Sequence, residues 1–211
     1  MKKKLSIVLI ALAGLFVQAQ NNEACLENLS FMGQLVKEKN PEAYDYLTIL
    51  RKDCPSFDKG IYSWGELAIK IKIDKATTPQ EKEKYARDLI KFYGEHDLNF
   101  PNNGAGNKMK KGLVLFDYKI GTDKEIYDLL DEAFKTDYAN FKYAKAMYVY
   151  FEILVKEHKA NNGVELQQVF DKYDDLSQKL VEEEDELTTE KDALLSKEEA
   201  GCANGTSITI E

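Results

Sequence analysis

The chain has 211 residues and a net charge of −8 at neutral pH, and 44% of its residues are apolar. A chain of this size and composition can bury a hydrophobic core, as one domain or as a short array of stacked units. Its negative charge argues against nucleic acid as a partner, because an acidic protein repels the phosphate backbone. Proline is rare, and the abundance of leucine, lysine, glutamate and alanine favours helices over strands.

Residues 1–19 have the three parts of a secretory signal peptide. Three lysines follow Met1, an apolar run of 13 residues extends from Leu5 to Val17, and the segment closes with Val17-Gln18-Ala19. The run is shorter than the roughly 20 residues of a membrane-spanning helix, so we expect cleavage after Ala19 rather than an uncleaved anchor. Cleavage removes three lysines and no acidic residue, so the net charge falls from −8 to −11, and no segment stays inserted in the membrane.

The mature sequence begins with two predicted helices. Apolar residues at three- and four-residue spacing predict the first helix from about Asn22 to Lys39. Asn40-Pro41 then supplies a stop, a cap and a proline for the first turn of the second helix, which closes at Cys54-Pro55. The predicted apolar stripe of this second helix is Ala43, Tyr44, Leu47, Ile49 and Leu50.

The helix–turn–helix pattern then repeats. A third helix is expected from Phe57 to about Asp74, and Thr77-Thr78-Pro79-Gln80-Glu81 is typical of a capped helix start for a fourth, which extends to about His96. The predicted apolar residues of the third helix are Ile61, Trp64, Leu67, Ala68 and Ile71. Those of the fourth are Tyr85, Leu89, Phe92 and Tyr93.

A segment rich in asparagine, glycine and proline, Asp97 to Lys108, predicts a central loop. A fifth helix is expected from about Lys108 to Tyr118, and Gly121-Thr122-Asp123 caps a sixth. The predicted apolar residues of the sixth helix are Ile126, Leu129, Leu130, Ala133 and Phe134. A seventh helix with a wide buried face is expected from Tyr138 to His158.

The last predicted helix, within residues 161–200, is long and acidic. Leu166, Tyr173, Leu180, Leu187 and Leu194 are seven residues apart, which is a partial heptad pattern. Val169 and Leu176 occupy the intervening heptad position first, and Glu183 and Glu190 occupy it further on. This pattern predicts a packed first half and a second half that is solvated or binds a partner. Residues 201–211 are expected to form a loose tail.

Helical pairs of about 34 residues resemble tetratricopeptide repeats. The resemblance is carried by Ala43, Leu47 and Pro55 in the first pair, and by helix–turn–helix rhythm alone in residues 57 to 160. It implies an all-α solenoid of about seven helices over residues 20–160, followed by the long acidic helix. The resemblance implies a scaffold for protein–protein contacts with no catalytic residues.

The signal peptide, the Cys-Pro close of the first pair and the acidic last helix also resemble exported repeat proteins of Gram-negative envelopes. We therefore expect a non-catalytic scaffold in the periplasm or at the outer envelope that binds a peptide or protein. The alternative is an assembly subunit of the envelope that self-associates through residues 164–200. An enzyme would need a cleft with paired acids of shifted pKa.

Cys25 and Cys54 are the candidate disulfide. Cys25 lies 15 positions before Asn40 and Cys54 lies 14 after it, so two antiparallel helices joined there bring both cysteines to the open end of the hairpin. Export to an oxidising compartment would allow the bond to form. The alternative is that both are small buried hydrophobic residues. Cys202 is left over, either for a partner or unpaired.

The candidate partner-binding residues are aromatic: Trp64, Tyr143 and Tyr150. Tyr143 and Tyr150 lie off the main apolar face of their helix and could line a groove.

No catalytic, cofactor or metal site is expected. His96 and His158 lie near helix ends without a second ligand at metal spacing, and a positive charge there would suit the helix dipole. The acidic run Glu182–Glu186 could attract a basic partner or calcium, but it lacks the spacing of a calcium loop. We interpret it as a solvated helix face.

Overall fold

The computed structural model describes residues 22–203, and the side chains of residues 22–197. The expected signal peptide and most of the expected tail lie outside these residues. The described part contains eight α-helices, one short 3-10 helix and no strand, which confirms the all-helical prediction there. The helices are the first helix (22–37), α2 (Ala43–Asp53), α3 (Gly60–Lys75), α4 (Pro79–Asn99), α5 (Asn107–Tyr118), α6 (Asp123–Thr136), η1 (Tyr138–Asn140), α7 (Ala144–Lys159) and α8 (Leu166–Ala203).

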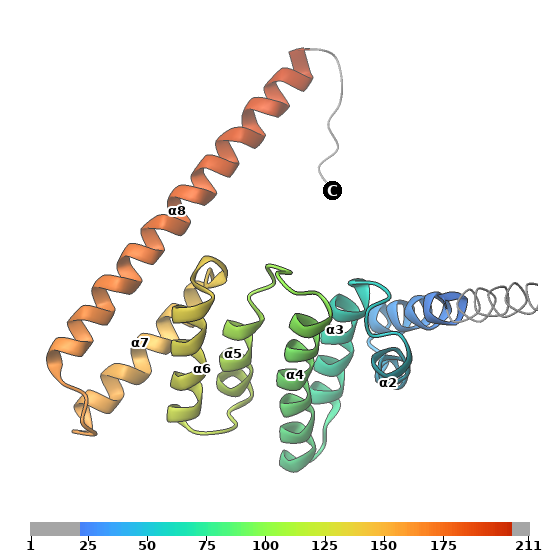
Figure 1. The fold of residues 1–211 in the computed structure, drawn as a ribbon, viewed down its shortest axis with the longest axis horizontal. Helices are drawn as coiled ribbons and strands as arrows, with labels where there is room; N and C mark the ends of the chain where they lie inside the picture. The colour runs from blue at the N-terminus through green and yellow to red at the C-terminus, as the bar shows by residue number, and fades with distance from the viewer. Residues whose placement is uncertain (1–21, 204–211) are drawn as a thin grey trace, which may run out of the picture. The chain divides into compact units, whose positions relative to one another are not determined.

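The chain divides into two compact units, Met1–Phe141 and Lys142–Glu211. The division groups α7 with α8, whereas the sequence placed the seventh helix with the helices before it. In the first unit each helix from α2 to α6 packs against the next one along the chain. Helices α3 to α6 stand side by side, with their connections alternating between the two ends of the row (Figure 1).

The predicted helix caps at Thr78 and Thr122 are confirmed. The predicted cap at Asn40 is wrong, because the N-cap of α2 is Glu42, whose side chain accepts no cap hydrogen bond. Helix α3 begins at Gly60 rather than at Phe57. Asn40 Oδ1 accepts a hydrogen bond from the Glu42 N–H at 2.9 Å. The Thr78 and Thr122 hydroxyls each accept from a backbone N–H three residues later, at 3.2 Å. The two threonine contacts each satisfy a donor that the first turn of a helix leaves without an intrahelical partner, whereas the Asn40 contact lies in the turn before α2.

The core of the first unit joins the first helix to α2, α3, α4 and Val114 of α5. Most of the predicted apolar residues are buried in it, but Ile49 and Leu67 are exposed, so their predicted burial is wrong. In α3 the buried face contains Tyr62, Ile69 and Ile73 instead. This face is rotated from the predicted one because α3 approaches its neighbours through a glycine.

That glycine, Gly65, marks the closest approach in the core. A Cβ atom at Gly65 would lie 2.5 Å from Phe92 Cζ and 2.7 Å from Leu47 Cδ1. Leu47 is completely buried and Phe92 almost so. Because protein cores are closely packed, we expect neither side chain to move away without cost.

We expect Gly65→Ala to lower the free energy of unfolding by about 1–2 kcal/mol, because overpacking outweighs the gain of alanine in a helix. Gly94→Ala in α4 is the matched control, since its Cβ would meet only Lys111 Nζ, at 3.6 Å. That variant should gain about 0.5–1 kcal/mol from helix propensity. Urea unfolding measures the free energy of unfolding of both variants. Equal changes would contradict the close approach of Leu47 and Phe92 to Gly65.

The predicted disulfide is present. Cys25 and Cys54 are joined with an S–S distance of 2.00 Å and a Cα–Cα distance of 6.0 Å. The bond ties the first helix to Cys54, the C-cap of α2, whose N–H donates to the Leu50 carbonyl. Both cysteines are also buried, so the disulfide forms part of the core.

The seventh helix begins later than predicted. The chain forms η1 and then leaves helical structure until Ala144. Phe141 is fully buried, and its ring lies edge-on to Phe134 with 5.3 Å between centroids. Docking of this ring in the first unit interrupts the helix that the apolar spacing alone predicted from Tyr138.

Candidate interaction site on the last helix

Helix α8 begins just after Gly163, which has a φ of +80°. The Glu165 N–H donates to Gln168 Oε1 at 2.8 Å, which satisfies a donor at the start of the helix. The helix then extends from Leu166 to Ala203 and packs against α7 within the second unit. It therefore continues three residues into the segment that was expected to be a loose tail.

One side of α8 is buried as far as Glu183. Val169 and Leu176, predicted to pack, are buried, and so are Lys179 and Glu183 one and two turns further on. Lys179 Nζ lies 2.5 Å from Glu183 Oε1, so the buried carboxylate is neutralised by a lysine one turn earlier. The expectation that Glu183 is solvated or faces a partner is wrong for this reason.

A different side of α8 exposes large apolar residues. The heptad residues Leu166, Tyr173 and Leu180, expected to pack in the first half, are exposed, so that expectation is wrong. The exposed fractions along the heptad are Leu166 52%, Tyr173 56%, Leu180 45%, Leu187 65% and Leu194 61%. Phe170, Val181 and Leu195 are also exposed beside this row. The described side chains of residues 184–197 are all exposed.

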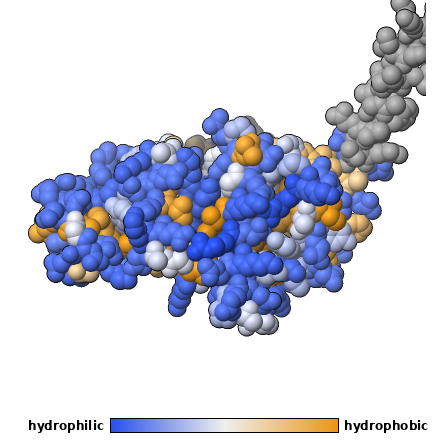
Figure 2. Space-filling view, turned by 60° about the horizontal axis from the view of Figure 1, so that its bottom comes forward, coloured by the Kyte–Doolittle hydropathy of each residue, from blue (hydrophilic) through white to orange (hydrophobic). Residues whose placement is uncertain are grey.

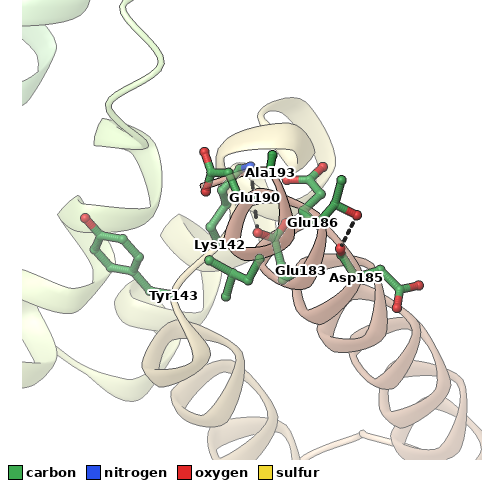
Figure 3. Close-up of a pocket in the computed structure, with 9 residues that line it drawn as sticks. Lys142, Tyr143, Glu183, Asp185, Glu186, Glu190 and Ala193 are labelled. Atoms are coloured by element: carbon green, nitrogen blue, oxygen red, sulfur yellow. Dashed lines mark hydrogen bonds and ion pairs between the residues drawn. The ribbon is translucent and has the colours of Figure 1, made fainter. Parts of the chain in front are cut away.

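A groove of about 780 Å³ lies between α8 and the residues that precede α7. Its lining includes Leu187. Tyr143 and several acidic side chains also line it (Figure 3). Lys142 Nζ crosses to α8 and lies 2.6 Å from Glu186 Oε2 and 3.8 Å from Glu183 Oε2. The hydrogen bond with Glu186 raises the pKa of Lys142, and it lowers the pKa of Glu186. Both side chains therefore stay charged at neutral pH.

The three aromatic residues predicted to bind a partner have different surroundings within their units. Tyr143 is 48% exposed and lines the groove, whereas Tyr150 is fully buried in α7. The Lys172 ammonium lies 4.8 Å from the centre of the Tyr150 ring. Tyr150 therefore cannot line a surface, and that prediction is wrong. Trp64 belongs to the first unit, half-buried beside Gly33 with Lys37 Nζ 5.7 Å from its ring.

Sequence reasoning found the apolar row but missed Lys142. The row was visible because its members are seven residues apart. Lys142 lies between helices, where no periodicity marks a residue as important, and its partners are more than 40 residues away.

A polar network between the end of α4 and the start of α5 holds His96. Asn107 Nδ2 lies 3.0 Å from His96 Nδ1 and donates to Asp97 Oδ1 at 2.7 Å. The imidazole also stacks on Tyr62, with 4.5 Å between ring centroids. Because the amide donates at Nδ1, this arrangement fits a neutral imidazole rather than the positive one expected from the helix dipole. Burial lowers the pKa of His96, although the nearby Asp97 acts in the opposite direction.

A lowered pKa means that the unfolded chain takes up a proton at His96 at a higher pH than the folded chain does. The contribution of His96 to stability is therefore present above about pH 6.5 and is lost as the pH falls through the folded-state pKa. We expect an NMR titration of His96 to give a midpoint below 6.5. The free energy of unfolding should fall more steeply with acid in the wild type than in His96→Phe, which keeps a ring against Tyr62. Parallel pH profiles would contradict this role.

Among residues 22–203, no group of three or more histidine, cysteine, aspartate or glutamate side chains is placed to hold a metal ion. No helix in this part of the chain is both long and apolar enough to cross a membrane. Figure 2 shows a face on which hydrophilic side chains predominate, with small hydrophobic patches between them. Comparison with known protein families, curated proteins and solved structures finds no match to this chain.

Proposed function

We propose that this chain is a non-catalytic scaffold that binds a peptide or protein on its helical surface. The observation that carries the proposal is the row of large apolar side chains exposed along α8, from Leu166 to Leu194. Monomeric proteins rarely expose contiguous apolar patches of more than a few hundred Å² unless the patch contacts another molecule. Tyr143, exposed in the groove beside this row, adds an aromatic side chain of the kind enriched at interfaces.

The packing in the first unit supports the tetratricopeptide-like part of the proposal. Helices α2 to α6 pack successively, and solenoid repeats also contact mainly their neighbours. Ala43 and Leu47, two of the residues that carry the resemblance, are fully buried. In this view the first unit is a short α-solenoid, and the long acidic helix α8 follows it in the chain as part of the second unit.

Export to the periplasm or outer envelope of a Gram-negative bacterium is also part of the proposal. The Cys25–Cys54 disulfide supports it, since such bonds persist mainly in oxidising compartments. The lysine-led apolar segment before Ala19 is the proposed export signal.

A second candidate function is an envelope assembly subunit that pairs with its own kind through residues 164–200. The exposed heptad row favours this candidate, because residues seven apart form the contact row of coiled coils.

Crosslinking followed by mass spectrometry tests the two candidate functions. The mature chain, residues 20–211, is crosslinked in an envelope extract. Crosslinks from residues 57–150 or from α8 to a different protein are the expected result for a scaffold. Crosslinks confined to residues 164–200 of two copies would support the assembly subunit and overturn the scaffold. Absence of any protein crosslink would also overturn the scaffold.

A further inference from the structure

The outer half of α8 carries an exposed apolar row that we call the distal seam: Leu180, Leu187 and Leu194. Val181 and Leu195 widen it on one side, and all five side chains are at least 45% exposed. From residue 184 to residue 197 every described side chain is exposed, so this stretch has no buried face of its own. An isolated helix of this length is only marginally stable in water, and its leucines favour contact with another apolar surface.

The geometry of the distal seam fits another helix. Its leucines are seven residues apart, so they lie on one side of α8 with about two helical turns between successive side chains. Residues 180–197 span about 27 Å at 1.5 Å per residue. A helix of about 18 residues would cover this length, with an apolar residue every three or four positions.

The charge around the distal seam distinguishes between possible partners. Residues 182–192 contain seven acidic side chains and one lysine. Lys142 and Lys179 neutralise Glu183 and Glu186 on the inner side. Glu184, Asp185, Glu190 and Asp192 are exposed near the seam. A second copy of this helix would bring the same acids against them, whereas lysine or arginine residues would complement them.

We propose that residues 180–197 bind a basic amphipathic helix of a different protein, an inference that rests on the proposed scaffold function. The apolar face of that helix packs on the distal seam. Its lysine and arginine residues flank the apolar face and meet the acids of α8 on both sides. The groove beside Tyr143 and Leu187 receives a large apolar side chain of the partner.

The test uses three fluorescent 18-residue peptides with the intact mature chain. The first is an amphipathic peptide of leucine and lysine, the second replaces each lysine with glutamate, and the third is a scramble of the first that has no apolar face. We expect the first peptide to bind, and the other two to bind at least about tenfold more weakly. Binding should weaken as salt rises from about 0.05 M to about 0.5 M, because the charges are exposed.

Variants locate the site. Two double variants should each weaken binding of the first peptide by at least about tenfold. One is Leu187→Glu with Leu194→Glu, and the other is Glu184→Lys with Glu190→Lys. The matched control is Asp171→Lys with Asp174→Lys, which makes the same charge change on the exposed inner half of α8 and should leave affinity within about twofold. All six positions are exposed, so circular dichroism and thermal unfolding should remain close to those of the wild type.

Equal binding of the acidic or scrambled peptide would overturn the inference, and so would the absence of binding at about 100 µM. A dimer of the chain would also overturn the inference. Sedimentation would detect it as a dimer that needs Leu187 and Leu194 and becomes more stable as salt rises. These failures remain distinguishable from failure of the proposed function, because crosslinks from residues 57–150 to another protein would leave the scaffold proposal standing.

Discussion

Replacing Cys25 and Cys54 together with alanine should lower the free energy of unfolding of the mature chain by about 3.5 kcal/mol. The cystine closes a loop with a sequence separation of 29 residues, and the chain-entropy estimate for such a loop gives this value. For a chain of this size the loss corresponds to a fall in Tm of about 7–14 °C. Urea and thermal unfolding, followed by circular dichroism, measure it.

The control is Cys202→Ser, which removes the third cysteine and should leave the unfolding midpoint unchanged. A reductant should destabilise the wild type as much as the double substitution does and have no effect on the double variant. A loss below about 1 kcal/mol would show that the packing of the first helix on α2 does not depend on the bond.

Replacing Arg51 with methionine should lower the free energy of unfolding by about 3 kcal/mol. The Arg51 side chain is 14% exposed, and it binds two carboxylates of α4: Nη1 lies 2.8 Å from Asp88 Oδ2 and Nε lies 2.7 Å from Glu95 Oε2. Its guanidinium also lies 5.2 Å from the centre of the Phe92 ring. Methionine keeps much of the volume but removes the guanidinium that binds both carboxylates, and Glu95 then keeps Lys91, whose Nζ lies 3.7 Å from Glu95 Oε1.

Electrostatics explain why this cluster is sensitive. Burial alone would lower the pKa of Arg51, but hydrogen bonds with Glu95 and Asp88 outweigh it and raise the pKa. Burial and the charge of Asp88 raise the pKa of Tyr44 to about 12, so its hydroxyl stays protonated and donates to Asp88 Oδ2 at 2.9 Å. One arginine therefore organises contacts between α2 and α4.

Two substitutions serve as controls for Arg51. Arg51→Lys keeps the charge but cannot reach both carboxylates with a planar fork, so we expect a smaller loss, of about 1–2 kcal/mol. Arg87 binds Glu83 and Glu125 at the surface, where its side chain is 44% exposed. Arg87→Met should change stability by less than about 0.5 kcal/mol. If Arg51→Met and Arg87→Met lowered the free energy of unfolding by similar amounts in urea, burial of the Arg51 cluster could not explain the loss caused by Arg51→Met.

Local signals predicted the helices well because their causes are local. Thr78 and Thr122 cap the starts of α4 and α6 in the structure, and each lies beside the turn it helps to form. The disulfide was also predictable, since two antiparallel helices joined at Asn40 would place Cys25 and Cys54 at nearly equal distances from the turn, 15 positions before it and 14 after it.

Periodicity did not predict which side of some helices is buried. Helix α3 has apolar residues on most sides, so its spacing fits more than one buried face. The close approach of Phe92 and Leu47 to Gly65 selects the observed face, and that contact depends on tertiary packing.

In the candidate site too, residue spacing did not determine which side of the helix is buried. Seven-residue spacing identified the apolar row of α8, but a heptad pattern assumes that both of its positions face one neighbour. In the structure Val169 and Leu176 are buried while Leu166 and Tyr173 are exposed. Burial of Glu183 depends on Lys179, which is four residues earlier in the same helix and could have been recognised as its partner.

The successive packing of α2 to α6 also bears on how the first unit forms. Its main helix–helix contacts join elements that follow one another in the chain. The contact order is therefore low, and chains of low contact order close only short loops on the way to the native state and fold rapidly. We expect contacts between neighbouring helices to form before those that join α2 to α4, such as the contacts of Arg51 with Asp88 and Glu95.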